Sequence, residues 1–396
     1  MRYSEFQNLK LSNLGFGAMR LPLTEDGRID ARATEAMVDY AMEHGINYYD
    51  TAYPYHNGMS EVVLCDALRK YNREDYYLAD KFPGHQVSDT HYPQGIFEEQ
   101  LEKCKVDYFD FYLLHNVYEG SIGTYMDPKW GITDYFVEQK KLGRIRHLGF
   151  SCHARVEALE QFLEKYGDVM EFCQIQLNYL DWTLQKGKEK VELLNRYNIP
   201  IWVMEPVRGG KLACIDEEGT KALKMHRPNE STASWSFRWL MDVPGVKVIL
   251  SGMSNMEQMK DNIETFSSGN SLSEEEKQLL SRIADTLKDS VPCTGCRYCV
   301  AGCPMQLDIP KLIAAYNDAK YEQSMIAGMS MEIFDKDKLP DACIGCGACA
   351  QACPQKIDIP GIMKDFAQIY KKLPKWADIC REREEAARKL KESMGK

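Results

Sequence analysis

The chain has 396 residues, of which 44% are hydrophobic and 27% charged, a composition typical of a soluble protein with a large core. Its formal net charge of −10 argues against a nucleic-acid partner, because binding to phosphates requires a basic face. The first residues lack the apolar core of a signal peptide, and no apolar run approaches the roughly 18 residues of a membrane helix. We therefore expect a cytoplasmic protein.

The first 270 residues alternate between short apolar strands and amphipathic helices. Eight such units over about 250 residues predict a closed (β/α)₈ barrel of parallel strands. An open, doubly wound sheet is the alternative, but its dinucleotide fingerprint is incomplete, because Arg20 stands where the third glycine belongs. The predicted strands are 14–19, 46–52, 76–82, 109–115, 145–151, 172–178, 199–205 and 247–252, and the helices that follow them are 30–44, 60–68, 93–106, 133–142, 155–166, 186–197, 231–241 and 256–266.

Polar side chains stand at the ends of four successive predicted strands, namely Asp50, Lys81, His115 and Ser151. Tyr55 follows the first of them closely, in the loop after a proline that cannot continue a strand. Each residue alone could be an ordinary surface or core group. Because the carboxyl ends of barrel strands meet at one mouth, the set together predicts a single site.

These residue types suit the reduction of a carbonyl, which requires a hydride on carbon and a proton on oxygen. A tyrosine is a poor acid near pH 7, because its unperturbed pKa is about 10. A neighbouring ammonium such as that of Lys81 stabilises the phenolate, and Asp50 can hold the lysine in place. His115 can hydrogen-bond to the substrate oxygen. We therefore expect Tyr55 to donate the proton in reduction and to accept it in oxidation.

Four segments carry a family resemblance: Gly15-Phe-Gly17, Asp50-Thr-Ala-Tyr-Pro-Tyr55, Ala-Asp-Lys81-Phe and Leu-Leu-His115-Asn. Over roughly residues 1–285 the chain resembles the aldo-keto reductases. The resemblance implies an NAD(P)H-dependent barrel enzyme whose catalytic tetrad is Tyr55, Lys81, Asp50 and His115.

The resemblance also implies a set of cofactor contacts. Ser151 and Gln174 match the pair that holds the nicotinamide amide, although Cys152 replaces the asparagine that often follows the serine. The arginine that many members place against a 2′-phosphate aligns near Gln258, which leaves the choice between NADP and NAD open. The other expected contacts are Met204 against the nicotinamide ring, Gly209 and Gly210 at the pyrophosphate, and Ser254, Gln258 and Asn262 on the adenosine side.

The remaining chain begins with a predicted helix over 272–287, which Ser273 and Glu276 start with a capping box. A cysteine run, Cys293-x2-Cys296-x2-Cys299-x3-Cys303-Pro, follows and recurs fifty residues later as Cys343-x2-Cys346-x2-Cys349-x3-Cys353-Pro. The repeat extends to an Asp-Ile-Pro at 308–310 and again at 358–360, and we expect each to open a helix.

This spacing is typical of bacterial [4Fe–4S] sites, in which the fourth cysteine of each run binds the other cluster. One cluster would then be held by Cys293, Cys296, Cys299 and Cys353, and the other by Cys343, Cys346, Cys349 and Cys303. Zinc and disulfides are the alternatives. The tail resembles two-cluster ferredoxin domains of the helical kind. The expected domains are a barrel at 1–285, a mainly α-helical ferredoxin-like domain at 286–375 and a charged helix at 376–396.

Three functional hypotheses follow. The first is a reductase of an anaerobe that acts on small carbonyls or alcohols, sugar-like ones included, with the clusters as an accessory electron carrier or a brace. The second is an electron-transfer protein that couples the barrel to a ferredoxin-like partner through the clusters, with an unrecognised carrier between them, since the sequence contains no flavin motif. The third is a redox sensor, which the tetrad disfavours. Candidates for the substrate pocket are His85, Tyr125 and Trp130.

Overall fold

The computed structural model describes residues 1–84, 87–287, 291, 293, 297–321, 323–353 and 357–393. The chain forms two compact units, Met1–Ser281 and Arg282–Lys396. The division between them lies a few residues before the boundary expected at residue 285. Within the described ranges, no helix combines the length and the apolar character needed to cross a membrane.

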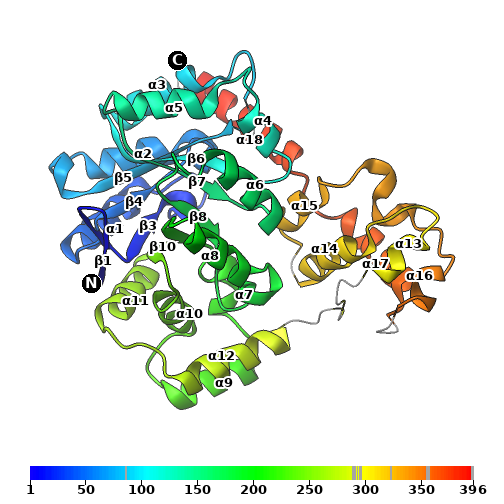
Figure 1. The fold of residues 1–396 in the computed structure, drawn as a ribbon. Helices are drawn as coiled ribbons and strands as arrows, with labels where there is room; N and C mark the ends of the chain where they lie inside the picture. Colours follow the sequence, from blue (N-terminus) through cyan, green and yellow to red (C-terminus); the bar gives the residue numbers. More distant parts are fainter. Residues whose placement is uncertain are drawn as a thin grey trace. The chain divides into compact units, whose positions relative to one another are not determined.

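The first unit is a closed barrel of parallel strands surrounded by helices (Figure 1). The order of strands around it is β10-β3-β4-β5-β6-β7-β8-β9, and β10 closes the ring by pairing Leu250 with Gly15 of β3. The predicted barrel is therefore confirmed, and the open sheet is wrong. The strands are β3 (Leu14–Gly17), β4 (Tyr48–Asp50), β5 (Tyr77–Phe82), β6 (Phe109–Val117), β7 (Ile145–Cys152), β8 (Cys173–Gln176), β9 (Ile201–Met204) and β10 (Val246–Ser251).

Each strand is followed by a helix on the outside of the barrel, as the periodicity predicts. These helices are α1 (Ala31–Glu43), α2 (Ser60–Leu68), α3 (Pro93–Cys104), α5 (Ile132–Lys141), α6 (Val156–Tyr166), α8 (Gly187–Arg196), α10 (Thr232–Met241) and α11 (Met256–Ser267). Further helical pieces lie in the connections between these elements, and the sequence pattern does not predict them. They are η1 (Ala18–Arg20), η2 (Tyr55–Gly58), η3 (Arg73–Asp75), α4 (Ile122–Met126), α7 (Asp181–Leu184), η5 (Arg208–Ala213) and α9 (Glu217–His226).

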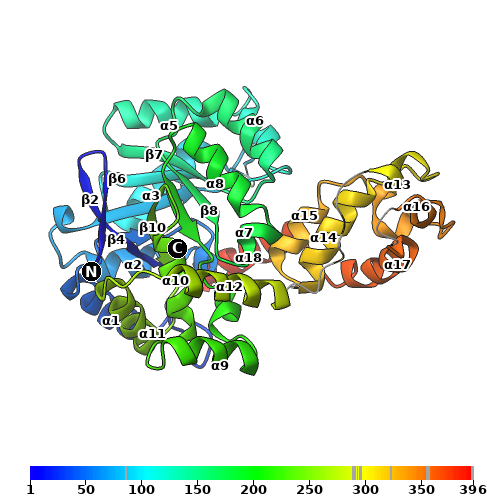
Figure 2. The same cartoon turned by 60° about the horizontal axis from the view of Figure 1, so that its bottom comes forward.

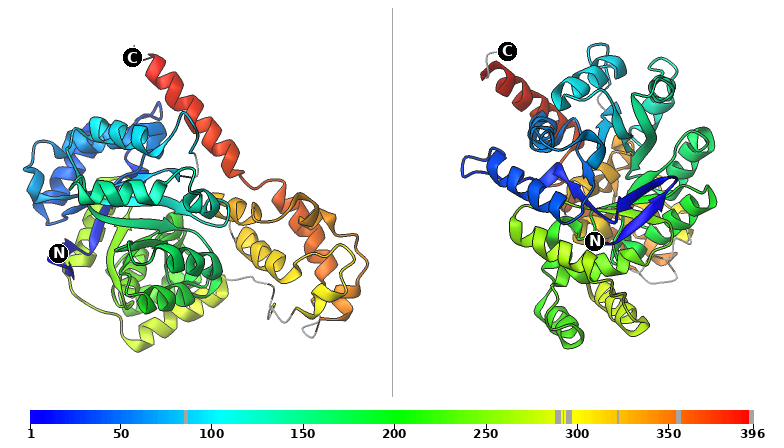
Figure 3. Two further views of the ribbon diagram at one scale, coloured as in Figure 1. Left: turned by 45° about the horizontal axis from the view of Figure 1, so that its top comes forward. Right: turned by 90° about the vertical axis from the view of Figure 1, so that its left-hand side faces the viewer.

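A hairpin of β1 (Tyr3–Phe6) and β2 (Leu9–Ser12), also not predicted, precedes the barrel (Figure 3, dark blue). Its buried residues Phe6 and Leu11 pack into the barrel core. The ring of Phe6 meets that of Trp202 edge to face, with 5.1 Å between the ring centroids. Tyr48, Phe172 and Trp202 of the same cluster lie at or next to the first residues of their strands, so the hairpin closes the amino-terminal end of the barrel. The opposite end remains for a site.

The second unit is helical, and its two longer core helices, α14 (Ile309–Tyr321) and α17 (Ile359–Tyr370), lie side by side (Figure 2). Both begin within an Asp-Ile-Pro repeat, and the Asp358 carboxylate accepts a hydrogen bond from the Gly361 N–H at 3.2 Å. The predicted helix starts are confirmed. The other elements are α13 (Tyr298–Ala301), α15 (Met325–Met331), η6 (Lys336–Lys338), η7 (Pro340–Ala342), α16 (Ala348–Gln351) and the charged helix α18 (Trp376–Ser393).

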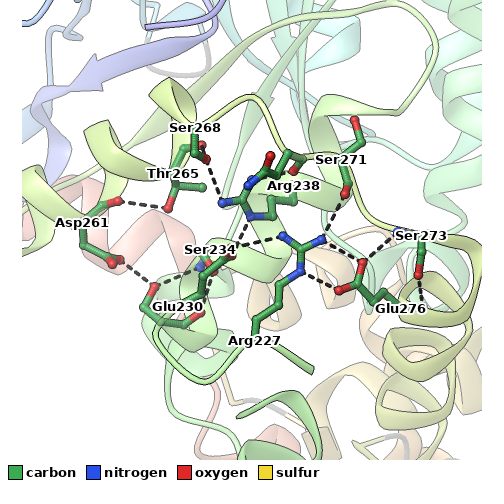
Figure 4. A network of polar contacts seen from close by, with 12 residues as sticks. Arg227, Glu230, Ser234, Arg238, Asp261, Thr265, Ser268, Ser271, Ser273 and Glu276 are labelled. Carbon is green, nitrogen blue, oxygen red and sulfur yellow. Dashed lines mark hydrogen bonds and ion pairs between the residues drawn. The ribbon is translucent and has the colours of Figure 1, made fainter. Parts of the chain in front are cut away.

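The predicted capping box starts α12 (Glu274–Leu287), which follows the last barrel helix. The Ser273 N–H donates to the Glu276 carboxylate at 2.7 Å, and the Glu276 N–H donates to the Ser273 hydroxyl at 3.2 Å. Arg227, just after α9, holds the same carboxylate with two hydrogen bonds of 2.6 and 2.8 Å (Figure 4). Glu230 joins Arg227 to Arg238 of α10, so one polar network ties together α9, α10 and α12.

We predict that Glu276→Gln lowers the free energy of unfolding at pH 7 by about 1–3 kcal/mol, because it weakens charge-assisted hydrogen bonds to a residue only 8% exposed. The hydrogen bonds from Arg227 lower the pKa of Glu276 from its ordinary value of 4.5 to about 2. The stabilisation is therefore complete above about pH 4.5 and is lost as the pH falls toward 2.

The measurement is urea unfolding of both proteins, followed by tryptophan fluorescence between pH 7 and pH 3. Only the difference between the two proteins is read at each pH, so acid effects elsewhere in the chain cancel. Glu275→Gln, at an exposed position of the same helix, is the matched control. A difference that does not shrink with falling pH would contradict the assignment.

Candidate active site

A buried ion pair lies at the carboxyl ends of β4 and β5. The Lys81 ammonium is 2.5 Å from a carboxylate oxygen of Asp50 and donates to the Thr51 carbonyl at 2.7 Å. The Lys81 side chain is 0% exposed, so these groups replace the water that a lysine normally binds. The same nitrogen lies 5.0 Å from the centroid of the Tyr55 ring. The pair thus joins two strand ends and faces the phenol.

The electrostatics of the pair keep the lysine charged. Burial lowers the pKa of Lys81, but the Asp50 carboxylate and then Tyr55 raise it more, so the net shift is above its ordinary value. Burial raises the pKa of the Asp50 carboxyl, and the Lys81 ammonium opposes this increase. At neutral pH the site therefore holds an ammonium whose field acts on the neighbouring phenol.

Tyr55 begins the short helix η2 directly after Pro54, and its N–H donates to the Ala52 carbonyl at 3.0 Å. This tight turn brings its ring beside His115 of β6, with 5.9 Å between the ring centroids and 82° between the planes. Both side chains are half-buried. The structure thus brings together Asp50, Tyr55, Lys81 and His115, the four residues of the predicted tetrad.

His115 stands at a β-bulge. The register between β6 and β7 shifts after Leu114, and Asn116 has a φ of 61°, in the left-handed region that asparagine tolerates better than most residues. A bulge interrupts regular pairing and can re-aim a side chain, and bulges are over-represented beside active sites. The sequence places His115 at the end of a predicted strand, but no local pattern predicts the irregular backbone there.

Ser151 of β7 and Gln174 of β8 are paired neighbours in the sheet and lie beside this bulge. The Ser151 hydroxyl accepts the Asn116 N–H at 2.8 Å and can still donate its own proton. The side-chain oxygen of Gln174 is buried and has no hydrogen-bond partner among the described residues. A buried unpaired acceptor is costly, so this oxygen fits a ligand that brings an N–H, such as a carboxamide.

The next expected contacts line the loop after β9. Met204 ends that strand and is half-buried. Gly209 and Gly210 have φ angles of 65° and 97°. Residues with a Cβ atom rarely adopt these angles, so glycine is favoured at both positions and the loop has no side chains there. Backbone of this kind fits the close approach of a pyrophosphate.

The same loop contains a buried ion pair that sequence reasoning missed, between Arg208 and Asp181 of α7. Asp181 also accepts hydrogen bonds from Gln176 at 2.8 Å and Asn178 at 2.6 Å. Arg208 is 27 residues from Asp181 along the chain, and Asn178 lies in an irregular segment. No periodic pattern in the sequence therefore indicates the network.

Of the residues expected on the adenosine side, Ser254 and Gln258 lie together at the exposed start of α11. The Ser254 N–H donates to the Gln258 side-chain oxygen at 2.8 Å. Asn262 follows Gln258 by one turn of the same helix, but it is buried, and its amide donates to the Ser251 hydroxyl at 3.0 Å.

The three substrate-pocket candidates differ in placement. His85 lies outside the described residues, and Trp130 is half-buried. Tyr125 is only 1% exposed, so the expectation that it contacts substrate is wrong. Its hydroxyl is already surrounded by backbone groups, which include the His115 carbonyl.

In the second unit, four cysteines of the predicted second cluster line one pocket with about 350 Å³ of space free of atoms, part of it open to solvent. The soft thiol donors and the apolar walls fit an iron–sulfur cluster. The thiols are Cys303, Cys343, Cys346 and Cys349, and the apolar walls include Met305, Leu307, Ile309, Ile344 and Met363.

Thiols of both sets belong to one apolar core, which includes Cys303, Cys343 and Cys349 of the pocket but not the exposed Cys346. Cys293, Cys299 and Cys353 of the other predicted cluster belong to it, whereas Cys296 lies outside the described residues. Within the described part of the chain, no three Cys, His, Asp or Glu side chains converge tightly enough to hold a single metal ion.

Two family models match the chain. The model of the aldo/keto reductase family covers residues 13–285, and the model of a 4Fe-4S dicluster domain covers residues 292–357. The first match spans more than half of the chain and includes the whole tetrad.

Individual proteins agree with the first match. The uncharacterized oxidoreductase YqkF of Bacillus subtilis is 28% identical over 305 residues, which are 69% of this chain and 93% of that protein. The NADH-specific methylglyoxal reductase of Escherichia coli is 23% identical over 326 residues, 71% of this chain and 97% of that protein.

Solved structures share the barrel. The holo form of the aldo-keto reductase AKR11C1 from Bacillus halodurans has a TM-score of 0.58 at 25% identity and covers 72% of this chain and 96% of that one. An aldo-keto reductase from Klebsiella pneumoniae in complex with NADPH has a TM-score of 0.57 at 20% identity and covers 70% and 93% of the two chains. At 20% identity, the second likeness shows a common fold only.

The ion pair generates a prediction about stability. Lys81→Met leaves the Asp50 carboxylate buried without its cation, and we expect the free energy of unfolding to fall by about 3–5 kcal/mol. The double variant Lys81→Met/Asp50→Asn removes both charges and should recover part of that loss. Urea unfolding followed by tryptophan fluorescence measures both. A single variant as stable as the wild type would contradict the buried pair.

Proposed function

The chain belongs to the aldo/keto reductase family, and we propose that it reduces small carbonyl compounds to alcohols with NADPH or NADH, with Tyr55 as the proton donor. The observation that carries the proposal is the Lys81 ammonium, held by Asp50 at 2.5 Å and lying 5.0 Å from the Tyr55 ring centroid. An ammonium at this position favours the phenolate that remains after the proton leaves.

Each residue of the tetrad then has one task. The substrate oxygen lies between the Tyr55 hydroxyl and the His115 imidazole, which orients it and donates a hydrogen bond to its growing negative charge. Tyr55 transfers its proton to that oxygen, Lys81 stabilises the phenolate, and Asp50 keeps Lys81 in place. A bound reduced nicotinamide supplies the hydride, so that carbonyl, NAD(P)H and one proton give alcohol and NAD(P)⁺.

The end of the barrel that carries the tetrad, here called the rim, can orient a nicotinamide by binding the carboxamide group of the nicotinamide. The unpaired oxygen of Gln174 would accept the amide N–H, and the Ser151 hydroxyl would donate to the amide oxygen. Met204 would pack against the ring, and the backbone at Gly209 and Gly210 would approach the pyrophosphate. Ser254 and Gln258 would lie nearer the adenosine, and the buried side chain of Asn262 would hold Ser251 at the end of β10 beside them.

The second unit would hold two [4Fe–4S] clusters. The pocket lined by Cys303, Cys343, Cys346 and Cys349 supports the second of these sites. The substrate would be a small carbonyl such as methylglyoxal, which the name of the Escherichia coli relative suggests as a first test compound.

A second candidate function is electron transfer to a ferredoxin-like partner. It is favoured by the loop beside the second cluster site, where Cys346 is exposed and Ile344 is 64% exposed. A cluster close to the surface can exchange electrons with another protein. The arrangement of the tetrad disfavours a pure sensor, which would have no use for a supported proton donor.

The first functional prediction concerns Tyr55→Phe, which removes the proton donor and keeps the ring. Because general acid catalysis contributes about 10²- to 10⁴-fold, we expect kcat for methylglyoxal reduction to fall by at least about 100-fold. The measurement is NADPH or NADH absorbance under anaerobic conditions. Tyr53→Phe, two residues earlier and bonded to Glu99 at 3.0 Å, is the matched control and should keep activity. Full activity in Tyr55→Phe would refute the proposal.

A second prediction separates the two candidate functions. Cys346→Ser should change the iron content and the electron paramagnetic resonance signal of the reduced protein, yet leave carbonyl reduction within about threefold, since hydride transfer needs no cluster. Cys214→Ser, at an exposed cysteine in the barrel unit, should change neither. Loss of turnover in folded Cys346→Ser protein would favour the electron-transfer function instead.

A further inference from the structure

One buried hydroxyl joins the ends of the two strands that carry Lys81 and His115. It belongs to Tyr125 of α4, a side chain only 1% exposed. Its oxygen lies 2.5 Å from the His115 carbonyl and 3.2 Å from the carbonyl of Phe82, the residue after Lys81. It also accepts the Gly84 N–H at 3.0 Å. Three backbone groups from two strand ends thus meet one side chain.

The bulge at His115 depends on such hydroxyls. A bulge leaves backbone groups without ladder partners, and buried groups of this kind need another partner. The Tyr125 hydroxyl donates to the His115 carbonyl, and the Ser121 hydroxyl donates to the Asn116 carbonyl at 2.7 Å. The Asn116 N–H donates to Ser151. Side-chain hydroxyls therefore hold the bulge in place of a neighbouring strand.

The residues packed around Tyr125 hold its side chain in this position. A Cβ atom added to Gly84 would lie 2.4 to 2.6 Å from atoms of the Tyr125 side chain, so the approach requires a glycine there. The Tyr125 carbonyl is held in turn by the Tyr166 hydroxyl at 3.1 Å. Burial raises the pKa of the Tyr125 phenol above its ordinary value, so the group stays a neutral hydroxyl.

We infer that Tyr125 is a positioning residue for the reductase reaction: beyond Phe82 and Leu114, the last paired residues of β5 and β6, its hydroxyl ties the two strand ends together and so keeps His115 beside Lys81 and Tyr55. The inference rests on the proposed function, because it assigns Tyr125 no contact with substrate or cofactor. A displacement of about 1 Å at a reacting group can cost on the order of 100-fold in rate. Loss of this one hydroxyl should therefore reduce turnover without weakening cofactor binding.

The test is Tyr125→Phe in the full chain, assayed with methylglyoxal and NADPH well below its melting temperature. We expect kcat per folded molecule to fall about 10- to 100-fold while KM for the cofactor stays within about twofold. Tyr49→Phe is the matched control, because it also removes a buried phenol that donates to a backbone carbonyl, here Ile46 at 3.3 Å. Tyr49→Phe should keep its kcat, which separates positioning from a general loss of stability.

Two further measurements keep the test decisive. The nuclear magnetic resonance signal of the His115 ring should shift in Tyr125→Phe and not in Tyr49→Phe. Gly84→Ala, which displaces the same ring, should reproduce the fall in kcat and covers the case in which Tyr125→Phe does not fold. If Tyr125→Phe and Gly84→Ala keep full kcat while Tyr55→Phe is inactive, the inference is overturned and the proposed function stands. If Tyr55→Phe is itself active, the proposed function fails first.

Discussion

The buried ion pair between Lys81 and Asp50 is the interaction on which the rest of the site depends. Withdrawing each charge from water costs several kcal/mol, and the cost is offset only by good geometry and by hydrogen bonds to the remaining donors. The Lys81 ammonium has both, through Asp50 at 2.5 Å and the Thr51 carbonyl at 2.7 Å. Because the position of the ammonium is set in this way, its field acts steadily on the neighbouring Tyr55 phenol.

The barrel makes this arrangement possible by separating its two ends. Phe6 and Leu11 of the amino-terminal hairpin fill one end with apolar side chains, so that end contributes stability. The other end gathers the last residues of the strands, and its irregular backbone is held by side chains such as Tyr125. The apolar end of the barrel thus contributes stability, and the polar rim at the other end forms the site.

Much of this could be predicted from the sequence, because it follows from local rules. The period of the apolar residues predicts the eight units, and the topology of a barrel then brings Asp50, Lys81 and His115 to one rim. The capping box at Ser273 and Glu276 is likewise local, and the structure contains it. The hairpin was missed because strands of four residues give no reliable alternation.

Other features depend on contacts between distant segments, which no local pattern reveals. Arg208 meets Asp181 only after two loops have folded. Tyr125 looked like a pocket residue because it lies in a loop after β6, yet tertiary packing turns it inward.

The central claim is direct reduction at the rim, although the same chain has a domain for one-electron carriers. The most direct measurement is product analysis after methylglyoxal reduction by NADPH that carries deuterium at the transferable position of the nicotinamide, with the clusters intact. Direct hydride transfer predicts one deuterium on the former carbonyl carbon of the alcohol. A product that carries only solvent hydrogen at that carbon would contradict the account. The electrons would then have reached the substrate without the hydrogen of the nicotinamide.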